Sequence, residues 1–158
     1  MSEQDFFSAS VQLFSITHLD VRAMELLYRV EMSGDHFYQQ LAATMTNPRV
    51  AELLQRNGRE ETGHARRIRK AVALKQPDYV EPPELSQLFT VSLPDTIDAA
   101  LFEAIVSAEL QGDAGYQAWA DNEPDPEIKT LLLRNGREET IHGERVREAI
   151  ALMHADAN

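Results

Sequence analysis

Two stretches of this chain are almost the same. Residues 56–64 read RNGREETGH and residues 134–142 read RNGREETIH, so eight of nine letters recur 78 positions later. When residues 31–75 are laid over residues 109–153 at this offset, 22 of the 45 positions are identical without a gap. Similarity at one offset over such a length marks a repeated structural unit. The chain is therefore predicted to consist of two copies of one unit.

A shorter match extends each copy toward its N-terminal side. Residues 12–20 (QLFSITHLD) match residues 87–95 (QLFTVSLPD) at an offset of 75. A chain of 158 residues has the size of one domain. We therefore expect a single domain over residues 1–158. Its predicted parts are repeat one, a connector and repeat two, at about 12–75, about 75–94 and about 87–153.

Within each unit, apolar residues recur with the period of an α-helix. In one segment the apolar or small side chains follow at intervals of three, four and seven residues, at Val50, Leu54, Gly58, Ala65, Ile68 and Val72. The seven prolines all lie at segment boundaries or in the connector, where a missing N–H does not disrupt a helix. Thr17 with Asp20, and Ser92 with Asp95, have the spacing of helix starts. The predicted helices are 19–46, 48–75, 95–123 and 125–154.

Loop lengths indicate how these helices pack. Loops of one or two residues make the two helices of each unit antiparallel neighbours. The 20-residue connector can reach about 66 Å, whereas a helix of 27 residues is about 40 Å long. It can therefore return along the whole length of the unit. We expect an all-α four-helix bundle with one long crossover, built from two helical hairpins related by a pseudo-twofold axis.

Six ionisable residues interrupt the otherwise apolar helix faces, at Glu31, Glu61, His64, Glu109, Glu139 and His142. A glutamate and a histidine three residues apart lie on the same face of a helix. Counting from the turn of each hairpin places the three residues of one repeat at one level, and the pseudo-twofold axis brings both sets together. Four buried carboxylates cannot stay ionised without compensation. Two divalent cations would balance them, and oxygen ligands with two imidazoles favour iron or manganese.

This pattern resembles the ligand set of the ferritin-like di-iron carboxylate proteins, in which two helices each supply a glutamate and two others each supply Glu-x-x-His. The resemblance covers about residues 19–154 and is closest to the rubrerythrin-like branch. It implies a ferritin-like bundle that binds two iron ions per chain, with manganese or a mixed pair as the alternative. Glu61 and Glu139 would bridge the ions. Tyr38 and Tyr116, each seven residues after a ligand glutamate, resemble the tyrosines beside the metals in bacterioferritin and rubrerythrin.

The resemblance implies an oxidoreductase that reacts with dioxygen or hydrogen peroxide, with an electron donor that the sequence does not identify, and a homodimer. A ferroxidase or iron-sequestering protein is the alternative, and a metal-free structural bundle is a third possibility. Gly112 stands where rubrerythrins carry an additional glutamate, which argues against their peroxidase activity. Thr62 stands where bacterioferritin has its haem-binding methionine, so no haem is expected. The 16 residues after His142 are too few for the fifth helix of cage-forming ferritins, which weakens iron storage.

The composition excludes several other classes of protein. The chain has no cysteine, which excludes an iron–sulfur cluster and a cysteine-ligated rubredoxin-type centre. A net charge of −11 argues against a nucleic-acid partner, because phosphate binding needs clustered Lys and Arg. No apolar run is long enough to span a membrane, so no membrane partner is expected. The start MSEQDFFSAS lacks the features of a secretory signal, which makes the cytoplasm the expected location.

Acidic residues flank the six candidate ligands in both repeats. Asp35 and Asp113, one helical turn beyond the candidate glutamates Glu31 and Glu109, are predicted either to orient a ligand imidazole or to face water. Glu60 and Glu138 could orient an imidazole too, but pairing with solvent or arginine is the favoured interpretation.

Inward-facing amides and small residues complete the predicted interior. Asn57 and Asn135 are predicted to satisfy the buried carboxylates, and Trp119 to fill the core. All seven glycines fall inside the predicted helices, where each costs about 1 kcal/mol relative to alanine. Either the metal site and its oxidant need the space, or the helices pack closely at these points.

Overall fold

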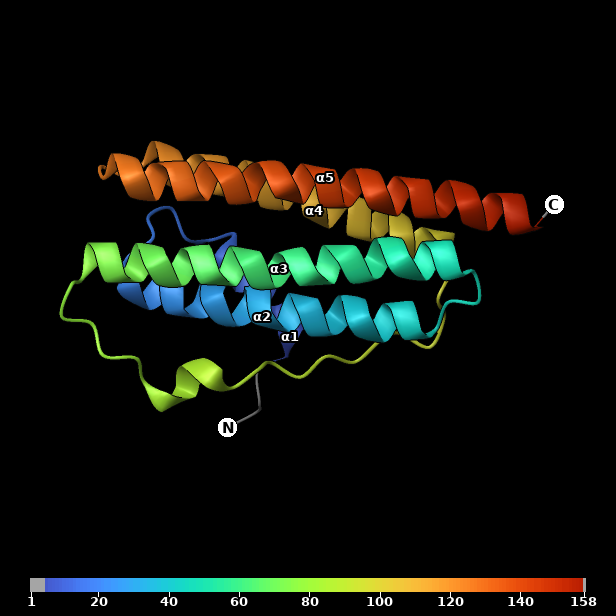
Figure 1. Ribbon diagram of the computed structural model, residues 1–158, viewed down its shortest axis with the longest axis horizontal. Helices are drawn as coiled ribbons and strands as arrows, with labels where there is room; N and C mark the ends of the chain where they lie inside the picture. Colours follow the sequence, from blue (N-terminus) through green and yellow to red (C-terminus); the bar gives the residue numbers. More distant parts are fainter. Residues whose placement is uncertain (1–4, 158) are drawn as a thin grey trace.

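The computed structural model describes residues 5–157 and is all-helical, as the sequence predicts (Figure 1). Its elements are α1 (Phe6–Leu13), α2 (Val21–Ala43), α3 (Pro48–Lys75), the short 3-10 helix η1 (Pro83–Ser86), α4 (Ala99–Asp121) and α5 (Pro126–Ala157). The helices α2 to α5 are the four long helices of a bundle. In the part of the chain that the structure describes, none of them combines the length and apolar character needed to cross a membrane.

Side-chain caps define where the long helices begin. The Asp20 carboxylate accepts a hydrogen bond from the Ala23 amide at the start of α2. Asn47 does the same for two amides of α3, whose first residue is Pro48. Asp125 caps α5 in the equivalent position, again before a proline. Because proline lacks an N–H that the first turn could not use, it suits these positions.

The four helices form two hairpins, whose backbones come closest to each other at α3 and α5. α2 packs along α3, α4 packs along α5, and α3 packs along α5. In Figure 1 the α4–α5 pair lies above the α2–α3 pair. α1 packs against α2, so the outer side of the first hairpin has a helical cover.

The crossover returns along the outer side of α2, below both hairpins in the view of Figure 1. The Arg29 side chain donates a hydrogen bond to the Gln87 carbonyl. Its guanidinium carbon lies over the Phe89 ring, 4.1 Å from the ring centroid. The Phe89 amide donates to the Ser33 hydroxyl at 2.9 Å. These contacts hold the connector on the bundle, as its predicted reach allows.

Apolar residues fill the bundle in two separate clusters. One contains Met24, Leu27, Ile68, Ile128 and Leu132, among others. The other, nearer the opposite end, contains Leu41, Leu54, Phe102, Val146 and Ile150. On each long helix the candidate ligands lie in the sequence between the residues of these clusters. The polar layer is therefore enclosed by apolar packing on both sides.

The structure corrects the predicted helices at two places. Helix α1 was not predicted, although Asp5 caps it through the Ser8 amide and Ala9 and Leu13 are its buried positions. Helix α4 begins at Ala99 with Asp98 as its cap, four residues later than expected at Asp95. The reason is that Leu93 and Ile97 pack against the bundle while the chain is still irregular.

Candidate metal centre

All six predicted ligands meet in the middle of the bundle. Glu31 lies on α2, Glu61 and His64 on α3, Glu109 on α4, and Glu139 and His142 on α5. Every one of them is buried, and both imidazoles are inaccessible to solvent. Each helix turns these polar groups inward because apolar residues before and after them on the same face are in the core.

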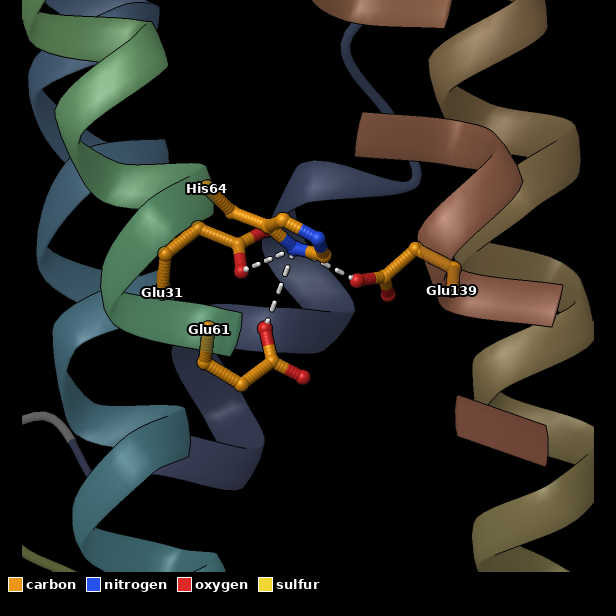
Figure 2. A group of neighbouring side chains, drawn as sticks. All are labelled: Glu31, Glu61, His64 and Glu139. Carbon is orange, nitrogen blue, oxygen red and sulfur yellow. Dashed lines mark hydrogen bonds and ion pairs between the residues drawn. The ribbon is translucent and has the colours of Figure 1, made fainter. Parts of the chain in front are cut away.

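The six residues form two overlapping groups of four. Within each group, one ligand atom from every residue lies within 4.8 Å of those from the others. One group contains Glu31, Glu61, His64 and Glu139, and the other contains Glu61, Glu109, Glu139 and His142. Figure 2 shows the first group, with three carboxylates from three helices turned toward one imidazole. Glu61 and Glu139 belong to both groups, so these two carboxylates lie between the two halves of the site.

The same ring nitrogen of each histidine faces the carboxylates. His64 Nδ1 lies 3.3 Å from Glu31 Oε2, 3.3 Å from Glu61 Oε2 and 2.8 Å from Glu139 Oε1. His142 Nδ1 lies 3.2 Å from Glu61 Oε1 and 3.7 Å from Glu109 Oε2. The two rings are nearly parallel, with centroids 5.2 Å apart. Each half of the site thus presents one nitrogen and several oxygens to a common space.

The pKa values of this cluster show that its buried carboxylates require nearby positive charge. Burial, and then the neighbouring Glu61 charge, raises the pKa of Glu31 to about 8. Burial also raises the pKa of Glu139 well above its usual range. Burial alone would lower the pKa of His142, but the facing glutamates raise it to about 12. Without metal, the site therefore retains protons near neutral pH, and a metal cation would replace their charge.

Unsatisfied atoms indicate that the cluster fits a metal pair. Within residues 5–157, five of its buried atoms make no hydrogen bond: His64 Nε2, Glu109 Oε2, Glu139 Oε1, His142 Nδ1 and His142 Nε2. They approach charged neighbours at ion-pair distance but without hydrogen-bond geometry. Buried polar groups are normally satisfied. Carboxylate oxygens and imidazole nitrogens are a suitable donor set for iron or manganese, so the residues present fit two such ions.

The outward ring nitrogens face a glutamate on the opposite hairpin. His64 Nε2 lies 3.3 Å from Glu138 Oε1, and His142 Nε2 lies 3.3 Å from Glu60 Oε1. The facing histidine, the first cause in each case, and then the neighbouring arginine lower the pKa of Glu60 and of Glu138 to about 2. A carboxylate in this place orients an imidazole and fixes its tautomer. Both glutamates thus lie where a carboxylate could orient the imidazole, the interpretation that the sequence analysis considered but did not favour.

Two arginines that sequence reasoning missed complete this arrangement. Arg67 donates to Glu138 at 3.1 Å, and Arg145 donates to Glu60 at 2.8 Å. They occupy equivalent positions, 78 residues apart, and that repetition was the signal that could have identified them. The predicted arginine pairing of the glutamates is thus present together with the imidazole contact.

Asp35 and Asp113 do not reach the imidazoles. Asp35 accepts from Thr62 at 2.9 Å and from Gln39 at 3.0 Å. Asp113 accepts from Thr140 and from a glutamine one turn later. Both aspartates thus link neighbouring helices of one hairpin, because their position on the helix points them at the partner helix rather than at the site.

The prediction for the two asparagines was wrong in its partner. Asn57 Nδ2 donates to the His142 carbonyl at 3.1 Å, and Asn135 Nδ2 donates to the His64 carbonyl at 3.2 Å. Both residues are fully buried, as expected for inward-facing side chains. Instead of binding the carboxylates, they join α3 to α5 beside each histidine.

Two buried tyrosines bind the remaining glutamates across the bundle. Tyr38 donates its O–H to Glu109 Oε1 at 2.5 Å, and Tyr116 donates to Glu31 Oε1 at 2.7 Å. Burial, and then the adjacent glutamate charge, raises the pKa of both phenols well above the ordinary value. Each phenol therefore stays protonated and holds a carboxylate that belongs to the other hairpin.

Glycines leave room for the two shared carboxylates, but unequally. A Cβ added to Gly112 would come within 2.6 Å of Glu139 Oε2. At the equivalent Gly34, the nearest atoms of Glu61 would be 3.5 Å away, an ordinary contact. A side chain at position 112 would therefore force the Glu139 carboxylate to shift, whereas one at position 34 would fit beside Glu61.

Comparison with known proteins agrees with this geometry. The family model described as rubrerythrin matches residues 24–150. The chain belongs to the rubrerythrin family. This family lies within the ferritin-like di-iron carboxylate superfamily, so membership confirms the resemblance that the ligand pattern suggested and implies a di-iron site. A search of curated proteins and a search of solved structures found no significant match.

Proposed function

We propose that this rubrerythrin-family chain is a di-iron oxidoreductase that reacts with dioxygen or hydrogen peroxide. The observation that carries the proposal is that Glu61 and Glu139 belong to both four-residue groups. Two ions sharing two carboxylates would be held close together, which allows them to act on one small oxidant as a pair.

Each group would hold one ion. Glu31 and His64 would be the ligands particular to one ion, and Glu109 and His142 those particular to the other. Glu61 and Glu139 would bridge them. Four carboxylates and two neutral imidazoles balance two divalent cations in charge, which removes the cost of burying like charges together.

Bound ferrous iron would supply two electrons, the number that converts one hydrogen peroxide and two protons into two water molecules. The protein's own residues prepare the site for this chemistry. Glu138 and Glu60 face the outer nitrogen of each imidazole, whose Nδ1 points inward, and the phenols of Tyr116 and Tyr38 donate hydrogen bonds to Glu31 and Glu109. The apolar clusters at both ends keep bulk water away from the reacting space.

Anaerobic reconstitution tests the proposal directly. The metal-free chain is loaded with ferrous iron, the iron per chain is measured, and the product is mixed with dioxygen or with peroxide while its absorbance is followed. Two irons per chain and rapid oxidation by either oxidant support the proposal. Iron binding of less than one per chain, or no oxidation by either, would overturn it. Continued uptake of iron into a large assembly would instead indicate an iron-sequestering protein.

A further inference from the structure

A groove with a volume of about 440 Å³ opens on the surface beside α4, facing the segment that follows α1. Phe14 and Thr17 of that segment line it together with Gln111 and Gly115 of α4 and with Asn122, whose side-chain amide donates a hydrogen bond to the Thr17 carbonyl at 2.8 Å. Among residues 5–157, none of those that line it carries a charge, although the chain as a whole has a net charge of −11. The groove is thus an uncharged surface on an acidic protein.

The inner wall of this groove is Trp119, the single tryptophan of the chain. Its Nε1 donates to the Ile16 carbonyl at 2.7 Å, which fixes the indole ring. A Cβ at Gly115 would lie 3.9 Å from the Cη2 atom of the indole. Trp119 is buried, with 6% of its surface exposed, and because Gly115 has no side chain, no Cβ at that position separates the indole from the groove that it lines.

From Trp119, aromatic contacts continue to the candidate metal centre. The indole meets the Tyr116 ring edge-on, with centroids 5.2 Å apart. Tyr116 in turn lies 6.3 Å from the His64 ring and donates its O–H to Glu31. Two oxidisable side chains therefore connect the groove with two candidate metal ligands.

The first hairpin has no equivalent route. The positions 78 residues earlier than Gly115 and Trp119 are Phe37 and Leu41. Phe37 is stacked under Phe6 of α1, with centroids 5.7 Å apart, so its side chain occupies the space that Gly115 leaves open. Beside Tyr38, the equivalent positions are thus occupied by phenylalanine and leucine, whose side chains are far harder to oxidise than tryptophan.

We propose that the groove over Trp119 binds an uncharged hydroquinone, and that Trp119 and Tyr116 pass its electrons to the metal centre. This inference rests on the proposed function, since it names the reductant of the same site. Anionic donors are disfavoured by the net negative charge. A flat uncharged ring matches the indole and phenyl walls, and its hydroxyl groups match the polar side chains of Thr17 and Gln111.

The electrons and protons of the transfer balance. With peroxide at the metal centre as the oxidant, Tyr116 would lose one electron toward it while its O–H proton moves to Glu31, 2.7 Å away. Trp119 would then give one electron to Tyr116, which would recover that proton. The hydroquinone gives one electron to Trp119 and one proton to solvent. Two such passes convert the hydroquinone to the quinone, and the two electrons, with two protons from solvent, convert one hydrogen peroxide to two water molecules.

The kinetic test uses iron-loaded protein, peroxide and trimethylhydroquinone as the probe. Trp119→Phe should slow oxidation of the probe about tenfold or more, because phenylalanine cannot relay the electron. Tyr28→Phe, which removes an oxidisable ring outside the route, is the matched control and should keep the wild-type rate. Hydroquinone sulfonate, the anionic probe, should be a poor donor. Iron content and oxidation of the ferrous site by peroxide alone should be unchanged in Trp119→Phe.

Two further readouts do not depend on turnover. Freeze-quenched wild type, mixed with peroxide without hydroquinone, should show a tryptophan radical by electron paramagnetic resonance that Trp119→Phe lacks. In metal-free protein, the oxidised probe, trimethylquinone, should quench the single tryptophan's fluorescence saturably. Gly115→Phe, which copies the first hairpin, should abolish this binding. Ala118→Asp places a charge in the groove and should abolish it too, even if Gly115→Phe does not fold.

The outcomes separate the two proposals. A wild-type rate of hydroquinone oxidation in Trp119→Phe, or unsaturable quenching in the metal-free wild type, overturns the route and the binding site while leaving the di-iron proposal standing. Failure of the wild type to bind iron or to react with peroxide overturns the proposed function itself.

Discussion

The two hairpins are nearly identical where they face each other and different where they face outward. Inward, each supplies two glutamates, one histidine and one tyrosine at the same register. Outward, the first hairpin packs Phe37 under α1, whereas the second leaves a groove over Trp119. The shared interior shows that a site built from both hairpins constrains both copies alike. The outer faces contact different segments, so they could diverge.

The largest effect should come from removing a shared carboxylate in either hairpin. Because Glu61 and Glu139 each belong to both groups, we expect Glu61→Ala and Glu139→Ala to lose most of both metal ions. Elemental analysis of protein expressed with added iron measures this. If one variant keeps two ions and the other loses both, the hairpins are not equivalent at the metal site.

A pH titration of the metal-free protein tests whether both hairpins hold buried protons. Glu31 has a pKa of about 8 in the folded chain, above the ordinary carboxyl value. Its contribution to the free energy of unfolding is present at acidic pH and is lost as the pH rises through about 8. The loss should be on the order of a few kcal/mol. The raised pKa of Glu139 acts in the same direction.

Urea unfolding of chelated protein at pH 5 and pH 8 measures this loss. Glu31→Gln should reduce the difference between the two pH values, and metal-loaded protein should show a much smaller one. Equal stability of the metal-free wild type at both pH values would contradict the buried-proton account.

Replacing the glutamates that face the outer imidazole nitrogens should have a smaller effect on metal binding, and one that is similar in both hairpins. Glu138 supports the histidine of the first hairpin, and Glu60 supports that of the second. Replacing either with glutamine should weaken metal affinity about 10- to 100-fold, to a similar extent in both variants. Competition with a chelator measures the affinity, and Arg59→Gln at an exposed position is the control. A loss in only one variant would show that the hairpins orient their imidazoles differently.

The smallest effect should be a difference in the free energy of unfolding between alanine substitutions at the equivalent glycines of the two hairpins. Gly34→Ala should raise the free energy of unfolding by up to about 1 kcal/mol, because alanine favours a helix and the new Cβ fits. Gly112→Ala should gain nothing, because its Cβ would displace the Glu139 carboxylate. Urea denaturation of both variants in the metal-free state measures the difference. A gain of the same size in both would contradict the unequal close approach.

The sequence predicted the parts of the molecule that depend on period and repetition. The four long helices follow from apolar spacing, and the six residues of the candidate site follow from polar interruptions of that spacing at the same register in both copies. Helix α1 was missed because it has only 8 residues and its apolar pattern is too short to stand out. The partners of Asn57 and Asp35 were also missed, because helical spacing tells which side of a helix a residue occupies but not which neighbouring atom it meets.

The amino-acid sequence alone was sufficient to predict the bundle and to identify its inward-facing carboxylates and imidazoles. The reason is that few arrangements can stabilise buried charges at repeated positions. They were not sufficient for the outer layer. Trp119 packs in the core, as expected, but nothing in its local pattern shows that it also lines a groove beside Gly115 or that the segment after α1 forms the facing wall. Such contacts join residues about a hundred positions apart. They depend on how α4 docks against the segment that follows α1, and periodicity within a single helix does not specify this docking.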